Sequence, residues 1–93
     1  MKYEIRFTGQ FKKDLKLAKR QGKNLDHLFD VINTIASDLP LDPKYHDHDL
    51  SGNYAGTREC HIEPDWLLIY EKRSTVLVLM LYRAGSHASL FKS

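Results

Sequence analysis

Hydrophobic positions along this chain recur with two different periods, which predict four strands and two helices. Alternating or continuous apolar runs of five to seven residues are typical of strands, and four such runs occur, at residues 3–7, 57–62, 66–70 and 76–82. Apolar residues recur at helical spacing in two other stretches, from Thr8 to Gly22 and from Asn24 to Asp38. The order of elements is therefore β-α-α-β-β-β.

This order predicts an α+β fold, with the two N-terminal helices on one face of a mainly antiparallel sheet and the other face open. Thr8 and Asn24 can cap the helix N-termini, and Gly22 can end the first helix. Residues 40–56 hold two prolines and two glycines without periodicity, so we expect an irregular loop there. Residues 76–82 are apolar on both faces, as a central strand would be.

The two most apolar strands, residues 66–70 and 76–82, predict a β-hairpin. A hairpin brings the residues before its first strand and after its second strand to the same edge of the sheet. His61 and Asp65 precede the first strand, and Arg83 and His87 follow the second. We therefore expect these polar side chains to meet in space, and we place the function there.

Composition limits the classes of protein that this chain can belong to. Ninety-three residues with 42% apolar residues predict one domain over residues 1–93. A single cysteine, Cys60, excludes a disulfide within the chain. The N-terminus does not resemble a signal peptide, and no apolar run approaches the roughly 20 residues of a membrane span. We expect a soluble cytoplasmic protein without a membrane partner.

Positive charge is concentrated in the first helix, although the net charge is only +2. Such a segment favours a polyanion or an acidic partner, and a merely solvated helix face is the alternative. Like charges at helical spacing repel one another, so local stability does not favour this arrangement. The expected cationic stripe consists of Lys12, Lys16, Lys19 and Lys23.

Two kinds of chemistry suit the polar residues near the hairpin. Histidines with a carboxylate could hold zinc, here His46, His48, His61 and His87 with Asp65 in reserve. Their spacing matches no standard structural zinc pattern, and Arg83 would add positive charge beside the ion. A His-based metal-binding protein is therefore an alternative.

RNA cleavage without a metal is the chemistry that the residues suit better. The 2′-hydroxyl of the RNA can act as nucleophile, histidine can transfer protons near neutral pH, and arginine can contact the charged phosphorane. Exposed aromatic rings can stack on unpaired bases. The chain supplies every part, in His48, His61, Asp65, Trp66, Arg83, His87 and Phe91.

Three separate motifs, in the same order along the chain, resemble the signature of the YafQ branch of the RelE/ParE toxins. The similarity extends over nearly the whole chain, both helices included. The motifs are Asp47-His48-x-Leu50-x-Gly52, His61-Ile62-x-Pro64-Asp65-Trp66 and Arg83-x-Gly85-x-His87-x-x-Leu90-Phe91.

The resemblance implies a toxin of a bacterial type II toxin–antitoxin pair that cleaves mRNA in the ribosomal A site. It implies no metal or organic cofactor, and neutralisation by an antitoxin encoded beside the toxin. The matching positions imply an acid–base group, a phosphate clamp at Arg83 and two substrate-orienting aromatic residues, Trp66 and Phe91. The ParE branch, which shares the fold and acts on DNA gyrase without nuclease chemistry, lacks the histidine constellation that this chain has. The implied acid–base group is His48, His61, Asp65 and His87.

Asp49 is a departure from the pattern, because relatives often have proline at this position. His48 is therefore flanked by Asp47 and Asp49. We expect nearby carboxylates to favour the protonated imidazole of His48. Which residue is the acid and which is the base does not follow from the sequence.

Overall fold

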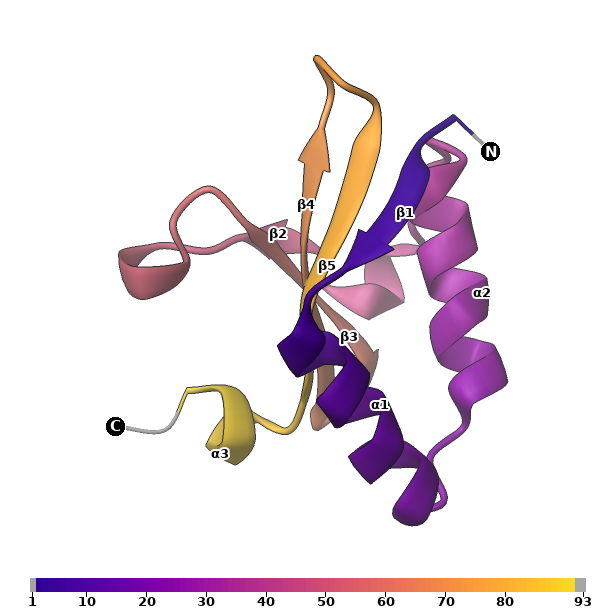
Figure 1. The fold of residues 1–93 in the computed structure, drawn as a ribbon, viewed down its shortest axis with the longest axis vertical. Coiled ribbons are helices and arrows are strands. Elements are labelled where there is room, and N and C mark those ends of the chain that lie inside the picture. The colour runs from indigo at the N-terminus through magenta and orange to yellow at the C-terminus, as the bar shows by residue number, and fades with distance from the viewer. Residues whose placement is uncertain (1, 92–93) are drawn as a thin grey trace.

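A five-stranded sheet forms the centre of the protein in the computed structural model, which describes residues 2–91 (Figure 1). The strands lie side by side in the order β1-β5-β4-β3-β2. Only β1 and β5 run parallel, which confirms the predicted mainly antiparallel sheet. β5 and β4 lie in the interior of the sheet, as their apolar sequences indicate. The strands are β1 (Glu4–Phe7), β2 (His48–Asp49), β3 (Arg58–Glu63), β4 (Trp66–Arg73) and β5 (Val78–Gly85).

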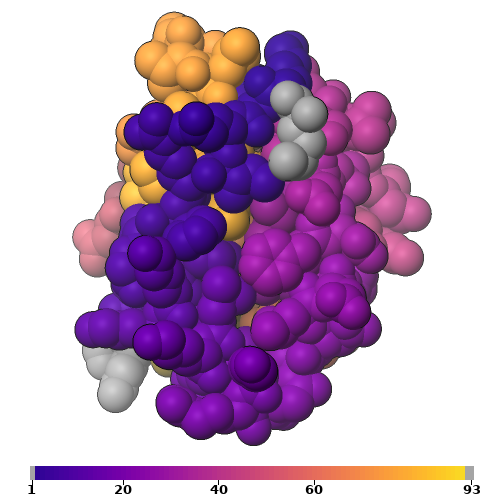
Figure 2. Space-filling model, turned by 45° about the vertical axis from the view of Figure 1, so that its right-hand side comes forward, coloured from indigo at the N-terminus to yellow at the C-terminus, as the bar shows by residue number. Residues whose placement is uncertain are grey.

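Two helices, α1 (Gly9–Arg20) and α2 (Leu25–Ala36), cover one face of the sheet, and α2 runs back in the direction opposite to α1 (Figure 1). The space-filling view shows that residues of the first 40 positions form most of this side of the molecule (Figure 2). The predicted caps are confirmed. The Thr8 side chain accepts a hydrogen bond from Phe11 N, and the Asn24 side chain accepts one from His27 N, both at 3.0 Å.

The main core lies between the two helices and the sheet. Phe11, Leu28 and Ile32 from the helices are fully buried there against Leu68 and other side chains of the strands. Cys60 belongs to this core, as its position in the alternating strand predicts, and burial raises the pKa of its thiol to about 12. A protonated, enclosed thiol is a poor nucleophile, so Cys60 is a packing residue.

The structure corrects the prediction at two places. The region expected to be an irregular loop contains the edge strand β2 between two short 3-10 helices, η1 (Pro43–Tyr45) and η2 (Gly52–Tyr54). The sheet face opposite α1 and α2 is not open. A one-turn helix, α3 (His87–Leu90), follows β5 and buries Leu90 against Leu67 and Ile69. Within residues 2–91, no helix is both long enough and apolar enough to cross a membrane.

Candidate active site

Glu59, a buried glutamate, lies beneath two of the predicted histidines. β2 pairs with β3 so that His48 stands opposite Glu59, while His61 follows two residues later on the same face. The Nε2 atom of His61 lies 3.2 Å from Glu59 Oε1, and the Nε2 atom of His48 lies 3.6 Å from the same oxygen. Glu59 is only 4% exposed. One carboxylate can therefore orient both rings.

Glu59 was not among the residues proposed from the sequence. Its side chain has the same parity as His61 in the alternating strand, which is the signal that could have identified it. A polar residue on the open face of a sheet is ordinarily solvated, so alternation alone did not distinguish Glu59. The short strand β2 places His48 opposite Glu59, and this contact distinguishes Glu59 from a solvated surface carboxylate.

Asp65 and His87 meet at the edge of the sheet, as the predicted hairpin requires. Asp65 Oδ1 accepts hydrogen bonds from the backbone N–H of His87 at 3.0 Å and from its Nδ1 at 2.9 Å. These two bonds hold the pKa of Asp65 below its usual value. The contact orients the imidazole and leaves its Nε2 atom on the other side of the ring.

The imidazole ring of His61 lies at the centre of a histidine cluster. Its centroid is 5.5 Å from that of His87, 5.7 Å from that of His46 and 6.4 Å from that of His48. The fifth histidine, His27, is apart from the cluster, on α2, with its Nε2 atom 3.0 Å from the hydroxyl of Tyr45. Four histidines from three segments of the chain thus gather, and two carboxylates contact three of them.

Phe91 extends the cluster on the far side of His87. The two ring centroids are 6.3 Å apart, and Phe91 is 41% exposed. The ring of Tyr54 meets Phe91 edge-on at 5.7 Å, and the Tyr54 hydroxyl donates to the backbone carbonyl of Leu90 at 3.4 Å. Tyr54, which the sequence did not single out, therefore supports an aromatic ring that has a face available to a ligand.

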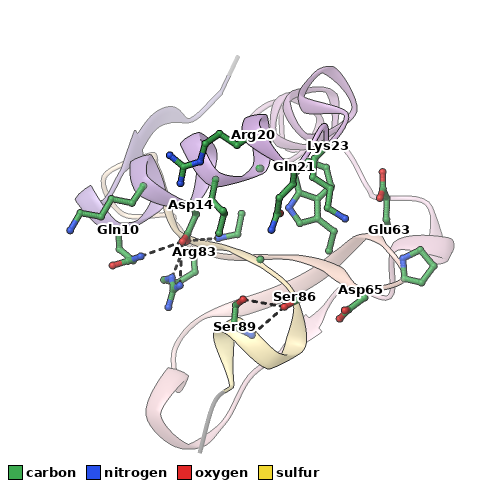
Figure 3. A pocket seen from close by; sticks show the side chains of 17 residues that line it. Gln10, Asp14, Arg20, Gln21, Lys23, Glu63, Asp65, Arg83, Ser86 and Ser89 are labelled. Atoms are coloured by element: carbon green, nitrogen blue, oxygen red, sulfur yellow. Dashed lines mark hydrogen bonds and ion pairs between the residues drawn. The ribbon is translucent and has the colours of Figure 1, made fainter.

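Arg83 is not a free cation, because it forms an ion pair with Asp14 of α1 (Figure 3). Its Nε atom donates to Asp14 Oδ2 at 2.9 Å and its Nη2 atom donates to Asp14 Oδ1 at 3.2 Å. These bonds raise the pKa of the guanidinium. Arg83 lies in the same row across the sheet as Glu59, with Ile69 of β4 between them.

The aspartates that flank His48 contact Arg58 instead. Arg58 Nη2 donates to Asp47 Oδ2 at 2.8 Å, and its Nη1 donates to Asp49 Oδ1 at 2.6 Å. The hydroxyl of Tyr70 also donates to Asp47, at 2.5 Å. The two aspartates thus share the single positive charge of Arg58, and the carboxylate that faces the imidazole of His48 is Glu59. The carboxylates that flank His48 in the sequence are therefore not the one that its imidazole faces.

The structure does not support the substrate-binding role predicted for Trp66. Its side chain belongs to the main core and is 2% exposed. A ring without a free face cannot stack on a base, so the base-stacking role expected of Trp66 does not fit the structure. Lys23 Nζ lies 5.9 Å from the centroid of the Trp66 ring and covers its outer side.

The predicted lysine stripe is shorter than its helical spacing suggested. Lys12, Lys16 and Lys19 are exposed on α1, as expected. Lys23 lies beyond the end of the helix, after the positive φ of Gly22 has turned the chain, and is half-buried beside Trp66. The exposed stripe on the helix therefore consists of three lysines, and we call Lys12, Lys16 and Lys19 the α1 stripe.

A cleft of about 640 Å³ separates α1 from the turn between β3 and β4 (Figure 3). Asp65 and Arg83 both line it, whereas the clustered histidines do not, so the cleft borders the candidate site on the side of α1. Three further cations from α1 and the turn after it line the cleft, and Lys23 contributes to the lowered pKa of Asp65. These cations, which we call the cleft set, are Lys13, Arg20 and Lys23.

Comparison with known proteins identifies the family of this chain. The sequence profile of a family described as bacterial toxin of type II toxin–antitoxin system, YafQ, matches residues 3–92. The mRNA interferase toxin YafQ of Escherichia coli K12 is 40% identical over 89 residues, which is 95% of each chain. This chain belongs to the YafQ toxin family.

Solved structures of YafQ toxins and their relatives share the fold. The toxin in the E. coli DinJ–YafQ toxin–antitoxin complex superposes with a TM-score of 0.87 at 38% identity, over 98% of this chain and 99% of that one. A metal-bound toxin from Helicobacter pylori superposes with a TM-score of 0.90 at 42% identity, over 96% and 99% of the two chains. The resemblance to the YafQ toxins and the α+β fold class, both predicted from the sequence, are thereby confirmed.

Proposed function

We propose that this YafQ-family toxin is an endoribonuclease that cleaves mRNA by acid–base chemistry, with the 2′-hydroxyl of the substrate as nucleophile. The single observation that carries the proposal is the convergence of His48, His61 and His87 on the two carboxylates Glu59 and Asp65. The 40% identity to an E. coli mRNA interferase supports the same activity. The test is induced expression with His87 intact or replaced by alanine, read out as growth arrest and as mapped mRNA ends.

Each part of the site has a place in this reaction. One imidazole takes the proton of the 2′-hydroxyl and another protonates the departing 5′-oxygen, since histidine changes charge near neutral pH. Glu59 and Asp65 hold the rings in orientation and stabilise them when they are protonated. The guanidinium of Arg83 contacts the phosphate oxygens and offsets the charge that develops on the phosphorane.

An aromatic residue, Phe91, places the substrate. Phe91 stands beside His87 with an exposed face, so it can stack on a base next to the scissile phosphate. Trp66 has no comparable face and takes no part in this step. The aromatic contact is tolerant of sequence because every base has a π-face.

The partners follow from the family. YafQ of E. coli has been solved in complex with the antitoxin DinJ, and we propose that an antitoxin protein also neutralises this chain. We propose that the toxin acts in the cytoplasm on mRNA in the ribosomal A site, where its cations meet rRNA phosphates.

The same site can hold a divalent metal ion, as the metal-bound toxin of H. pylori suggests for a relative. Glu59, His61 and His87 each offer a ligand atom, and these atoms lie within 4.8 Å of one another. Two imidazoles and one carboxylate form a donor set that zinc accepts. Because two of these ligands are the proposed proton-transfer residues, we propose that a metal ion inhibits the toxin.

Metal removal therefore tests the chemistry. We expect a zinc-selective chelator to leave cleavage unchanged, provided that the Mg²⁺ of the ribosome complex is held constant. Added Zn²⁺ should slow cleavage, and its binding measured by calorimetry should weaken in the Glu59→Gln variant. Loss of activity on chelation, with recovery on adding zinc back, would show that metal is required and would contradict the proposal.

The α1 stripe should govern ribosome binding rather than chemistry. We expect the triple substitution of Lys12, Lys16 and Lys19 by glutamine to weaken ribosome binding and to flatten its salt dependence by about one unit of log–log slope per lost phosphate contact. Codon preference should not change, because phosphate contacts carry no sequence information. Filter binding over a range of salt concentrations measures both quantities.

The cleft set offers a matched control, since glutamine at its three positions removes the same net charge. Equal weakening by the two triple variants would mean that the ribosome senses only net charge. Unchanged binding of the α1 stripe variant at every salt concentration would make the stripe a solvated helix face.

A further inference from the structure

We propose that Asp14 is a positioning residue that fixes the guanidinium of Arg83 toward the scissile phosphate. The inference rests on the proposed function, in which Arg83 contacts that phosphate. Asp14 lies on α1, 69 residues away in sequence from Arg83, and no motif of the active site includes it.

Both carboxylate oxygens of Asp14 accept hydrogen bonds from neighbouring residues. Besides the two bonds from Arg83, its Oδ2 atom accepts a hydrogen bond from the backbone N–H of Ala84 at 3.0 Å. Gln10 Nε2 donates to Oδ1 at 3.2 Å (Figure 3). The carboxylate is 8% exposed. Asp14 is therefore tied to the backbone of β5 next to Arg83, and the orientation of the guanidinium follows from that anchor.

Stability alone does not explain a carboxylate at this position. Asp14 lies on the buried side of α1 between Phe11 and Ala18, where an apolar residue could pack. Replacing a buried ion pair by apolar residues is often neutral or stabilising, so such a pair is weak evidence for a purely structural role.

The pair instead gives Arg83 a defined geometry before substrate arrives. A guanidinium carries five N–H groups in a rigid fork. Asp14 takes the Nε–H and one Nη2–H, so the Nη1 edge and the second Nη2–H, which lie near the Tyr54 side chain, are the donors that can reach phosphate oxygens. A donor that is oriented in advance need not reorganise as charge develops on the phosphorane.

The experiment is a kinetic comparison of the Asp14→Asn toxin with wild type on ribosome–mRNA complexes. Because misplacement of a catalytic group by about 1 Å can cost on the order of 10²-fold, we expect the single-turnover rate to fall by about that factor. The half-saturating concentration should change only a few-fold, since the contact matters most in the transition state. Asp30→Asn, an exposed carboxylate on α2, is the matched control and should behave as wild type.

A double-mutant cycle separates positioning from folding. If Asp14 acts through Arg83, then Asp14→Asn should cost nothing further in the Arg83→Ala background. Equal losses in both backgrounds would overturn the proposal, as would a faster rate for Asp14→Asn, which would mean that the ion pair holds Arg83 back.

Circular dichroism melting shows whether each variant is folded, and Asp14→Glu, which keeps the charge, replaces Asp14→Asn in the cycle if that variant does not fold. Full activity of the Arg83→Ala toxin would contradict the proposed role of Arg83 itself, an outcome distinct from failure at Asp14 alone.

Discussion

Replacement of His87 by alanine is expected to slow mRNA cleavage by about 10²- to 10⁴-fold and to relieve growth arrest on expression. The range is the usual contribution of one properly placed general acid or base. The His87 side chain lies on the surface and is 53% exposed, so its removal leaves no cavity in the core. The loss should therefore appear in the rate and not in the melting temperature. Single-turnover cleavage and thermal unfolding measured on the same preparation check both statements.

The structure supplies a matched control for this variant. His27, on α2, is the one histidine outside the cluster, and its Nε2 atom contacts the hydroxyl of Tyr45 rather than Glu59 or Asp65. We expect His27→Ala to keep its cleavage rate even if it melts somewhat earlier. A folded His87→Ala toxin that still arrests growth as the wild type does would remove His87 from the site.

A single 2′-deoxy nucleotide immediately 5′ of the scissile phosphate is expected to stop cleavage at that position. The reason is that the cluster contains histidines, carboxylates and an arginine but no activated serine or cysteine. Cys60 is buried, with a pKa raised to about 12, so it cannot replace the 2′-hydroxyl. The normal product should then end in a 2′,3′-cyclic phosphate or in the 3′-phosphate that forms from it.

The control substrate carries the deoxy nucleotide one position farther from the cut, and it should be cleaved at the normal rate. Product ends can be identified by their mobility before and after phosphatase treatment. Efficient cutting of the first substrate, or a product with a 3′-hydroxyl, would show that water or a protein group attacks the phosphate, and would overturn the mechanism.

Local patterns along the chain were enough to predict most of the fold. The caps at Thr8 and Asn24, the turn at Gly22 and the hairpin of β4 and β5 all depend on residues close in sequence. The hairpin also predicted the meeting of Asp65 with His87, because strand pairing determines which residues share an edge. Local sequence carries this information since caps, turns and register are short-range properties.

Strand β2 and helix α3 could not be predicted in the same way. β2 has two residues, too few for a period, and it exists because pairing with β3 and the contacts of Arg58 hold it. α3 is a single turn stabilised by the Asp65 contact and by burial of Leu90. Isolated helices of this length are not stable in water, so only tertiary contacts make it a helix.

Only the tertiary structure determined which residues contact the histidines and Arg83. Glu59 became part of the site when β2 placed His48 over it, and Asp14 when α1 packed against the end of β5. Trp66 does not belong to the substrate-binding group because its ring is buried in the core. The sequence by itself determined which chemical groups are present and which strand edge they share. Which of these charged groups pair with one another depends on contacts between segments up to 69 residues apart. A charged side chain can form an ion pair only with a group that tertiary packing places within a few ångströms of it.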